Sequence, residues 1–256
     1  MKILVAIKQV PSRDSYLKVD ASGRWVDESD LTFEINEPDA YALEEALQLR
    51  EKHGGEVVAL CAGAGRAVSS VREALAKGAD RGVHVAEENL AGVDTFHLGQ
   101  LLAKAMAAES PDLILTGLQS DDLGHGQSGV VAAELLGLPH ATIIMQVELG
   151  EGSIRVKREL EDGWFQHMTL PLPAVLTIQS GISKLRYATL MGIKKARTKE
   201  IKTTTAAELG VDLGAHASIE KVYAPPRSKQ TLMLNGSAQE QAAQLVEKLQ
   251  REVRVL

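Results

Sequence analysis

The sequence predicts an α/β protein: a doubly wound, mostly parallel sheet with an antiparallel extension and a C-terminal arm. Through about residue 140, short continuous apolar runs alternate with helical patterns. Continuous apolar runs are typical of parallel strands that helices cover on both faces. Three runs separated by short turns follow, as in an antiparallel meander. A linker and one amphipathic helix end the sequence.

The parallel part of the sheet is predicted from four apolar runs with helical patterns between them. The first helix begins near Pro38, because proline suits a first helical position, and it ends at the glycines after His53. Three more helices cover about 66–77, 94–109 and 126–136, each followed closely by glycine or proline. This order predicts right-handed crossovers between parallel strands. The four runs are Ile3–Ile7, Val57–Ala62, Gly82–Val85 and Leu113–Thr116.

The middle of the chain departs from this alternation. The runs Ile143–Leu149, Ile154–Leu160 and Trp164–Leu170 are separated by short turns that contain glycine. Runs of this length joined by such turns predict an antiparallel meander. Ala174–Gln179 is again a continuous apolar run, so we expect it to return to the parallel part of the sheet.

Past about residue 200 the pattern of a buried core weakens. Thr205–Glu208 fits a capping box at the start of a helix. Residues 224–227 suit an extended linker, and 237–252 suit a terminal amphipathic helix. We therefore expect an α/β domain over residues 1–222 and a linker with a helix over 223–256. That helix needs an apolar surface to pack on, either in this chain or in a partner.

Composition excludes several classes of protein. The formal charge of -6 gives no general attraction to nucleic acid or to an anionic membrane. A single cysteine, Cys61, rules out cysteine-rich zinc and iron–sulfur sites, and we expect it to be a buried thiol in a strand. The seven histidines include no His-x-x-x-His pair, so no metal site is predicted. No run suits a signal peptide or a membrane span, so we expect a cytoplasmic protein without direct membrane insertion.

Nucleotide chemistry is expected where parallel strands end, because open α/β sheets bind ligands beside the carboxyl ends of their strands. The richest such segment follows the fourth strand and leads directly into a helix. Its glycines permit close approach, and the helix N-terminus with Ser128 offers N–H groups and a hydroxyl to a phosphate. The alternative is a polar loop that only caps the helix. The segment consists of Gly117, Leu118, Gln119, Ser120, Asp121, Asp122, Leu123, Gly124, His125, Gly126, Gln127 and Ser128.

Standard catalytic fingerprints are absent from the sequence. Gly63-Ala64-Gly65 lacks the third glycine of the dinucleotide motif, and neither a Walker lysine nor a Gly-x-Ser-x-Gly elbow occurs. Asp121 and Asp122 could form an acid/base pair, but ribose hydrogen bonding or plain loop polarity is favoured because no nucleophile accompanies them. We therefore predict nucleotide binding without catalysis by this chain.

A family resemblance is carried by four stretches. Residues 156–168 (VKRELEDGWFQHM), followed by PAVLT, resemble the signature of electron transfer flavoprotein β subunits. Met168 departs from that pattern, which usually has Leu, Ile or Val there. The resemblance is collinear over about residues 1–215 and implies an adenine nucleotide alpha hydrolase-like fold. The other three stretches are Val5–Pro11, Asn36–Ala46 and Gly78–Val85.

The resemblance implies cofactors and partners. Family members bind a structural AMP on the β subunit and hold the redox FAD mainly on the α subunit. They accept electrons from dehydrogenases, such as acyl-CoA dehydrogenases of fatty acid oxidation, and pass them to a quinone oxidoreductase or another acceptor. This implies an electron carrier rather than an enzyme, with the C-terminal helix packed on the α subunit. The AMP-contacting positions correspond to Ala6, Asn36, Glu37, Pro38, Asp39, Ala62 and Gly117–Ser128.

Two alternatives remain open. Electron-bifurcating relatives carry a second FAD in place of AMP and have Gln-Val-Gly-Pro where this chain has Gln127-Ser128-Gly129. The Ser128 hydroxyl favours AMP, whereas Val10-Pro11 resembles the bifurcating branch. From another class, the chain could be a free-standing adenine-nucleotide-binding protein.

A basic segment at about 180–200 resembles the family's recognition loop, which docks acyl-CoA dehydrogenases. It is rich in Lys and Arg and contains one acid, Glu200. Leu190 corresponds to the anchoring leucine, with Arg186 and Tyr187 beside it. An apolar anchor within a basic rim is typical of an interface. The alternative is a solvated basic helix with Leu190 in the chain's own core.

Overall fold

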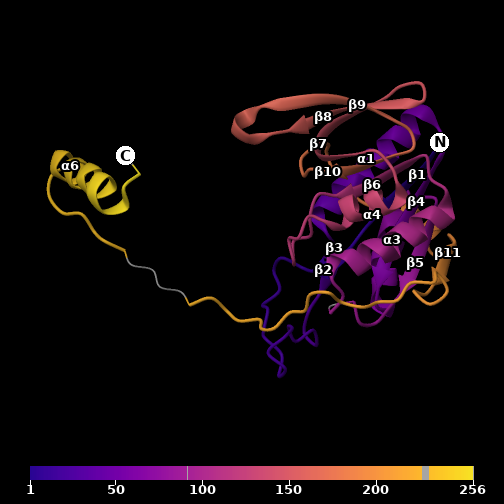
Figure 1. Cartoon of the computed structure of the whole chain (residues 1–256), viewed down its shortest axis with the longest axis horizontal. Coiled ribbons are helices and arrows are strands. Elements are labelled where there is room, and N and C mark those ends of the chain that lie inside the picture. Colours follow the sequence, from indigo (N-terminus) through magenta and orange to yellow (C-terminus); the bar gives the residue numbers. More distant parts are fainter. Residues whose placement is uncertain (91, 227–230, 256) are drawn as a thin grey trace. The chain divides into compact units, whose positions relative to one another are not determined.

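The computed structural model in Figure 1 describes residues 1–90, 92–226 and 231–255. The described chain forms two compact units, Met1–Val222 and Tyr223–Leu256. The first unit contains a nine-stranded sheet with helices on both faces, and the second contains the terminal helix. No helix among the described residues has both the length and the apolar character that crossing a membrane requires.

The nine-stranded sheet has the order β11-β5-β4-β1-β6-β10-β7-β8-β9. Neighbours from β11 to β7 pair in parallel, whereas β7, β8 and β9 pair antiparallel. This arrangement confirms the predicted fold class. The strands are β1 (Lys2–Ala6), β4 (Glu56–Gly63), β5 (Arg81–Ala86), β6 (Leu113–Gly117), β7 (His140–Leu149), β8 (Ser153–Glu159), β9 (Phe165–Pro171), β10 (Ala174–Ile178) and β11 (Ile201–Thr204).

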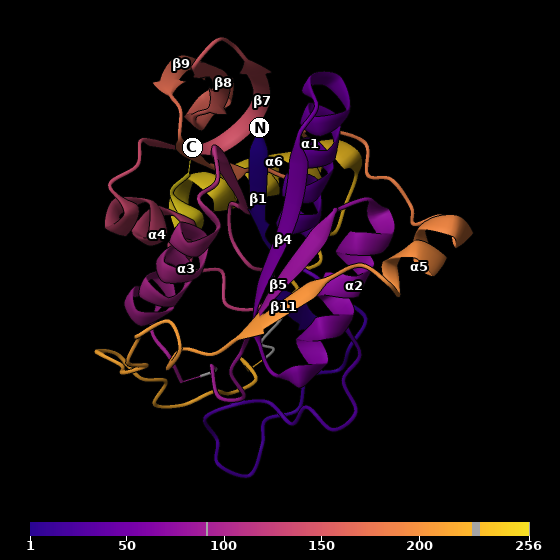
Figure 2. The same cartoon turned by 90° about the vertical axis from the view of Figure 1, so that its right-hand side faces the viewer.

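Helices cover both faces of the parallel strands. Figure 2 shows α1 and α2 on one face of the sheet and α3 and α4 on the other. The short helix α5 lies against α2. Turns of 3₁₀ helix occur at Gly65–Ala67 and Glu161–Gly163. The helices of the first unit are α1 (Glu37–His53), α2 (Val68–Lys77), α3 (Thr95–Glu109), α4 (Ser128–Leu136) and α5 (Leu190–Ala196).

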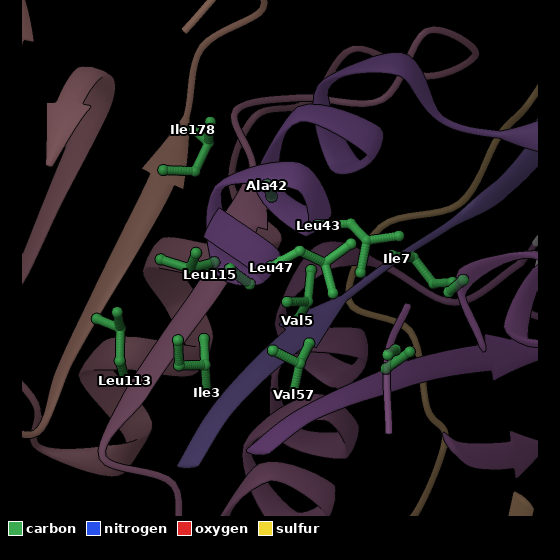
Figure 3. Packing of buried hydrophobic residues seen from close by; sticks show 14 of the residues in the cluster. Ile3, Val5, Ile7, Ala42, Leu43, Leu47, Val57, Leu113, Leu115 and Ile178 are labelled. Carbon is green, nitrogen blue, oxygen red and sulfur yellow. The ribbon is translucent and has the colours of Figure 1, made fainter. Parts of the chain in front are cut away.

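Strand β1 shows why the apolar runs are continuous. Ile3 and Val5 pack in the layer that contains α1, and Leu4 and Ala6 pack in the layer that contains α3. Figure 3 shows Leu47 of α1 beside Val5 in the first layer. Burying a Leu or Ile side chain stabilises the fold by about 1.5–3 kcal/mol. A strand with helices on both faces therefore gains from an apolar side chain at every position.

The order of the strands reverses between β1 and β6. From β1 the chain passes through α1 to β4 and then to β5 on one side. It then returns through α3 to β6, which pairs with the other side of β1. Ligands of open α/β sheets bind outside the carboxyl ends of strands at such a reversal. This edge carries the segments that the sequence singled out.

The structure adds elements that the sequence did not predict. A small antiparallel pair joins β2 (Gln9–Pro11) to β3 (Phe33–Ile35), and α5 forms within the basic segment. Strand β11 pairs with β5 at the sheet edge, although we expected only a weak core there. These strands are short or largely polar, so they lack the pattern of a strand buried on both faces.

Two predicted helix starts differ from the structure. The helix expected from Gly126 begins at Ser128, because Gly126 has a φ of +63°, which is outside the helical region. At Thr205 the predicted capping-box hydrogen bonds form with Glu208, at 2.9 and 3.2 Å. Only a turn follows, since the chain has just left β11 and bends so that Ala206 is buried.

The second unit contains α6 (Ala238–Lys248) followed by a π-helical turn at Leu249–Val253. A complete capping box between Ser237 and Glu240 begins α6, within the range that the sequence predicted. None of its residues is buried, and Leu245 and Val246 are about half exposed. The linker predicted over 224–227 falls partly outside the described residues, because it includes Arg227.

Candidate functional site

Segments far apart in the sequence meet at the carboxyl edge of β1 and β6. Ala6 at the end of β1 pairs in register with Thr116 of β6 on one side and with Leu60 of β4 on the other. Ala62 lies two residues beyond Leu60, at the end of β4. The N-terminus of α1 and the loop of residues 117–128 reach this edge through hydrogen bonds. The structure therefore brings together the predicted site segments.

Asp39 joins the ends of the two central strands. Its Oδ2 accepts a hydrogen bond from the N–H of Lys8 and its Oδ1 accepts one from the N–H of Gly117, both at 2.8 Å. The carboxyl group is buried, and burial raises its pKa to about 7 although both hydrogen bonds favour the ionised form. Both oxygens of Asp39 are thus used within the fold. They position the strand ends on which a ligand would rest.

Asn36 holds the loop of residues 117–128 against α1. Its Nδ2 donates to the carbonyl of Gln119 at 2.9 Å, and its Oδ1 accepts from the N–H of Asp121 at 2.9 Å. The backbone N–H of Asn36 donates to the carbonyl of Lys8 at 2.9 Å. Its side chain is almost fully buried and bonded at both ends. Asn36 and Asp39 therefore shape the site through the backbone that they hold.

Two basic side chains form ion pairs with the loop of residues 117–128. Lys8 Nζ lies 2.6 Å from Asp122 Oδ1 and 3.3 Å from Ser120 Oγ. Arg13 forms ion pairs with Glu37 and, at 3.2 Å, with Asp121. Burial opposes ionisation of Asp122, yet the Lys8 ammonium and hydrogen bonds hold its pKa below the ordinary value. Asp121 and Asp122 thus pair with different cations.

Our sequence reasoning did not include Lys8 and Arg13 among the site residues. Lys8 could have been found from its position directly after the first predicted strand. Arg13 gave no comparable signal, because its ion pairs join residues 24 and 108 positions away. Contacts of that kind depend on the folded arrangement of the loops.

Helix α4 presents its N-terminus at the same edge. The N-cap residue Gln127 forms no side-chain cap, and its Oε1 instead accepts a hydrogen bond from Thr95 at 2.9 Å. The first N–H groups of a helix have no partner within the helix. The Ser128 hydroxyl also has no hydrogen-bond partner among the described residues. A β-carbon on Gly129 would lie 2.6 Å from Thr116 Oγ1, so glycine lets α4 begin directly on β6.

The remaining loop residues differ in exposure. The N–H of Leu118 donates to the carbonyl of Ile178 at 2.9 Å, which fixes the start of the loop to β10. At the tip, Leu123, Gly124 and His125 are exposed, and the positive φ of Gly124 allows the sharp turn there. Pro38 is buried in the first turn of α1.

The predicted docking residues lie away from this edge. Tyr187 is 93% exposed and Leu190, the first residue of α5, is 87% exposed. Leu190 is therefore not part of this chain's own core. Arg186 is partly buried, and its guanidinium pairs with Glu44 and Glu51 of α1. Tyr187 and Leu190 are thus exposed, whereas Arg186 contacts its own chain.

Comparison with known proteins identifies the family. Residues 24–209 match the model of the electron transfer flavoprotein domain. The electron transfer flavoprotein subunit beta of Methylophilus methylotrophus is 38% identical over an alignment 257 residues long, which covers 96% of this chain and 97% of that protein. The chain belongs to the electron transfer flavoprotein β-subunit family. The subunit beta of Bradyrhizobium diazoefficiens and the mitochondrial one of Arabidopsis thaliana are 35% and 34% identical, each over the full length of both chains.

Membership in the electron transfer flavoprotein family confirms the resemblance found in the sequence and makes this chain a subunit of an electron carrier. The region that matches the family model contains α1, the loop of residues 117–128 and α5. The end of β1 lies before residue 24, but the full-length relatives cover it as well. The similarity therefore extends over both the strand-end site and the exposed segment.

Proposed function

We propose that this chain binds one AMP at the carboxyl edge of β1 and β6, as the β subunit of a heterodimeric electron transfer flavoprotein. The observation that carries the proposal is the start of α4 beside the end of β6, where the first N–H groups have no side-chain cap and the Ser128 hydroxyl has no partner among the described residues. A helix N-terminus favours a phosphate through its dipole and its free donors. Asn36 and Asp39 hold the surrounding backbone in place.

The α subunit is the proposed partner that holds most of the FAD. The flavin supplies the electron-accepting chemistry of the complex. This chain contributes a rigid base, the nucleotide that stabilises the loop of residues 117–128, and the exposed docking residues Tyr187 and Leu190. The proposed donor is an acyl-CoA or related dehydrogenase, and the acceptor is a quinone oxidoreductase or another electron acceptor. We place the complex in the cytoplasm.

The second unit is proposed to pack on the α subunit. Its helix α6 leaves Leu245 and Val246, on its apolar side, about half exposed. An amphipathic helix is stable mainly when its apolar side is packed. An α subunit that contacts residues 223–256 would supply that surface.

Nucleotide content tests the proposal most directly. The chain is co-expressed with the neighbouring flavin-binding subunit, the complex is purified, and its nucleotides are released by heat and counted. We expect one AMP and one FAD per heterodimer. Two FAD and no AMP would instead identify the bifurcating type, and a nucleotide-containing protein without a flavin partner would identify a free-standing binding protein.

Electron acceptance is tested separately with the same complex. An acyl-CoA dehydrogenase, reduced by its own substrate, is mixed with the purified complex while the flavin absorbance is followed. Bleaching that depends on the dehydrogenase supports the proposed donor. A complex that contains FAD but is not reduced would reject this donor class while leaving the nucleotide site untouched.

A further inference from the structure

We propose that Arg186 is a positioning residue, which clamps the docking segment, residues 187–193, to helix α1 through Glu44 and Glu51. The inference rests on the docking role proposed above and assigns a structural cause to it. From the sequence, Arg186 was counted among the partner-docking residues, beside Tyr187 and Leu190. The geometry points to an indirect role, in which the arginine acts on the partner only through the segment that it holds.

The clamp consists of one guanidinium and two carboxylates. Arg186 Nε lies 2.8 Å from Glu44 Oε2 and Nη2 lies 3.0 Å from Oε1, so the pair with Glu44 is bidentate. Nη1 lies 2.6 Å from Glu51 Oε1. Glu44 and Glu51 are seven residues apart on α1, which places them on one face of the helix. Planar bidentate pairs of this kind fix geometry as well as charge.

Burial of the Glu44 carboxylate distinguishes this half of the clamp from an ordinary surface ion pair. The Glu44 side chain is 6% exposed and also accepts a hydrogen bond from Gln48 at 2.8 Å. Burial opposes its ionisation, but the hydrogen bonds from Arg186 and Gln48 hold the pKa of Glu44 below the ordinary value. The backbone N–H of Arg186 reaches the same carboxylate at 3.3 Å. Side chain and backbone of Arg186 are therefore both fixed to α1.

The other end of the segment is fixed to α2. A β-carbon on Gly192 would lie 2.3 Å from the carbonyl oxygen of Ala76, so α5 rests directly on α2. Arg72 Nη1 donates to the carbonyl oxygens of Ala196 and Lys199, both at 2.7 Å. Lys199 Nζ in turn donates to the carbonyl of Leu75 at 3.1 Å. The docking segment is thus held at both ends.

Exposed apolar side chains lie between these two anchors. Tyr187 and Leu190 are almost fully exposed, and Met191 and Ile193 are 62% and 44% exposed. Neighbouring exposed apolar residues mark interaction surfaces. Holding them on a fixed backbone lowers the entropy that is lost when a partner binds. The partner that fits carries an apolar pocket for Leu190, as the proposed dehydrogenase would.

The test separates positioning from direct contact. Glu51→Gln removes half of the clamp but leaves the charge of Arg186 in place. Positioning predicts that both Glu51→Gln and Arg186→Gln raise the KM for the reduced acyl-CoA dehydrogenase, by about fivefold, with little change in kcat. Direct contact predicts that Arg186→Gln alone is impaired. Arg186→Lys keeps the charge without the bidentate fork, so positioning predicts an intermediate KM.

The measurements use the αβ complex with its bound cofactors. Glu28→Gln is the matched control, because it removes a carboxylate that pairs with Arg66 at 2.8 Å outside the docking segment. Amide hydrogen exchange provides a readout that does not depend on activity: loss of the clamp should speed exchange within residues 187–193. Melting temperature and AMP content establish that each variant folds.

Leu190→Ala in the same assay distinguishes the two proposals. If Leu190→Ala leaves the KM unchanged, the proposed docking role is rejected, and the clamp is rejected with it. If Leu190→Ala raises the KM while Glu51→Gln behaves like Glu28→Gln, only the clamp is overturned. The clamp is also overturned if the amides of residues 187–193 exchange at the wild-type rate in Arg186→Gln.

Discussion

Asp39 and Gly117 approach each other so closely that a side chain at position 117 has no room. Asp39 Oδ1 accepts the N–H of Gly117 at 2.8 Å, and a β-carbon on Gly117 would lie 2.3 Å from the same oxygen. The backbone of Pro38 and Asp39 would also lie within 3 Å of that carbon. Helix α1 therefore starts directly against the end of β6. The loop of residues 117–128 departs from this point.

Gly117→Ala should consequently move the start of α1 away from β6. Neither the buried carboxylate nor the backbone near it can give way without losing hydrogen bonds, so we expect a loss of about 1–3 kcal/mol in the free energy of unfolding. AMP content should fall with it. The matched control is Gly92→Ala, since a β-carbon on Gly92 meets nothing within 4 Å. Equal melting temperatures for the two variants would contradict the close approach.

Asp39 also predicts a pH dependence of stability. Its pKa is raised from 3.8 to about 7, mainly by burial. Between those values the folded chain keeps a proton that the unfolded chain has released, so the stability due to this group falls as the pH rises. The loss amounts to about 4 kcal/mol and ends above about pH 7, where both states are ionised. Urea unfolding between pH 4 and 8 measures it.

Asp39→Asn should remove this part of the slope and should lower the stability near pH 4, because an amide nitrogen cannot accept the second N–H. Glu45, whose pKa burial also raises to about 7, contributes a slope of the same sign. The contribution of Asp39 is therefore the difference between the wild-type and variant profiles. Asp14→Asn, at an exposed position, should leave the slope unchanged. Parallel wild-type and Asp39→Asn profiles would show that Asp39 is ionised in the folded chain throughout this range.

Ser128→Ala tests the phosphate contact. If the hydroxyl meets a phosphate, its removal should weaken AMP retention by about 1–3 kcal/mol without lowering the melting temperature of the nucleotide-free protein. Ser128→Thr keeps the hydroxyl and should retain AMP. Equilibrium dialysis with AMP measures both variants. Equal affinity of Ser128→Ala and wild type would remove Ser128 from the site.

The sequence predicts most of the sheet because burial on both faces leaves a pattern in each strand. Ile3–Ile7 is apolar throughout, since helices cover both sides of β1. Strand β11 has no such pattern: it lies at the sheet edge and carries Lys202, Thr203 and Thr204. Edge strands pair mainly through their backbone, which leaves little trace in the choice of side chain.

The location of the candidate site was also predictable from the sequence, but the contacts that its side chains make were not. Strand ends are found from hydrophobic runs, so the loop after β6 could be chosen from the sequence. Asp39 and Gly117 are 78 positions apart, and their contact exists only after the crossover through β4, α2, β5 and α3 is complete. Arg186 shows the same limit, because only the folded structure places Glu44 and Glu51 beside it.

The last prediction concerns the Lys8 side chain and the rate at which the proposed AMP is released. Its ammonium ties Asp122 and Ser120 to the end of β1 and so holds the loop of residues 117–128 beside the site. Lys8→Met should speed AMP release severalfold. It should cost less than about 1 kcal/mol in stability, because the Lys8 side chain is 36% exposed.

High salt should reproduce part of this effect in the wild type, since screening weakens a partly exposed ion pair. Timed desalting followed by nucleotide analysis measures the release rate. Lys18→Met is the control, because Lys18 pairs with Asp30 at 3.6 Å on the exposed arm before β3. If Lys8→Met and Lys18→Met release AMP at the wild-type rate, the Lys8–Asp122 pair has no part in holding the loop over the nucleotide.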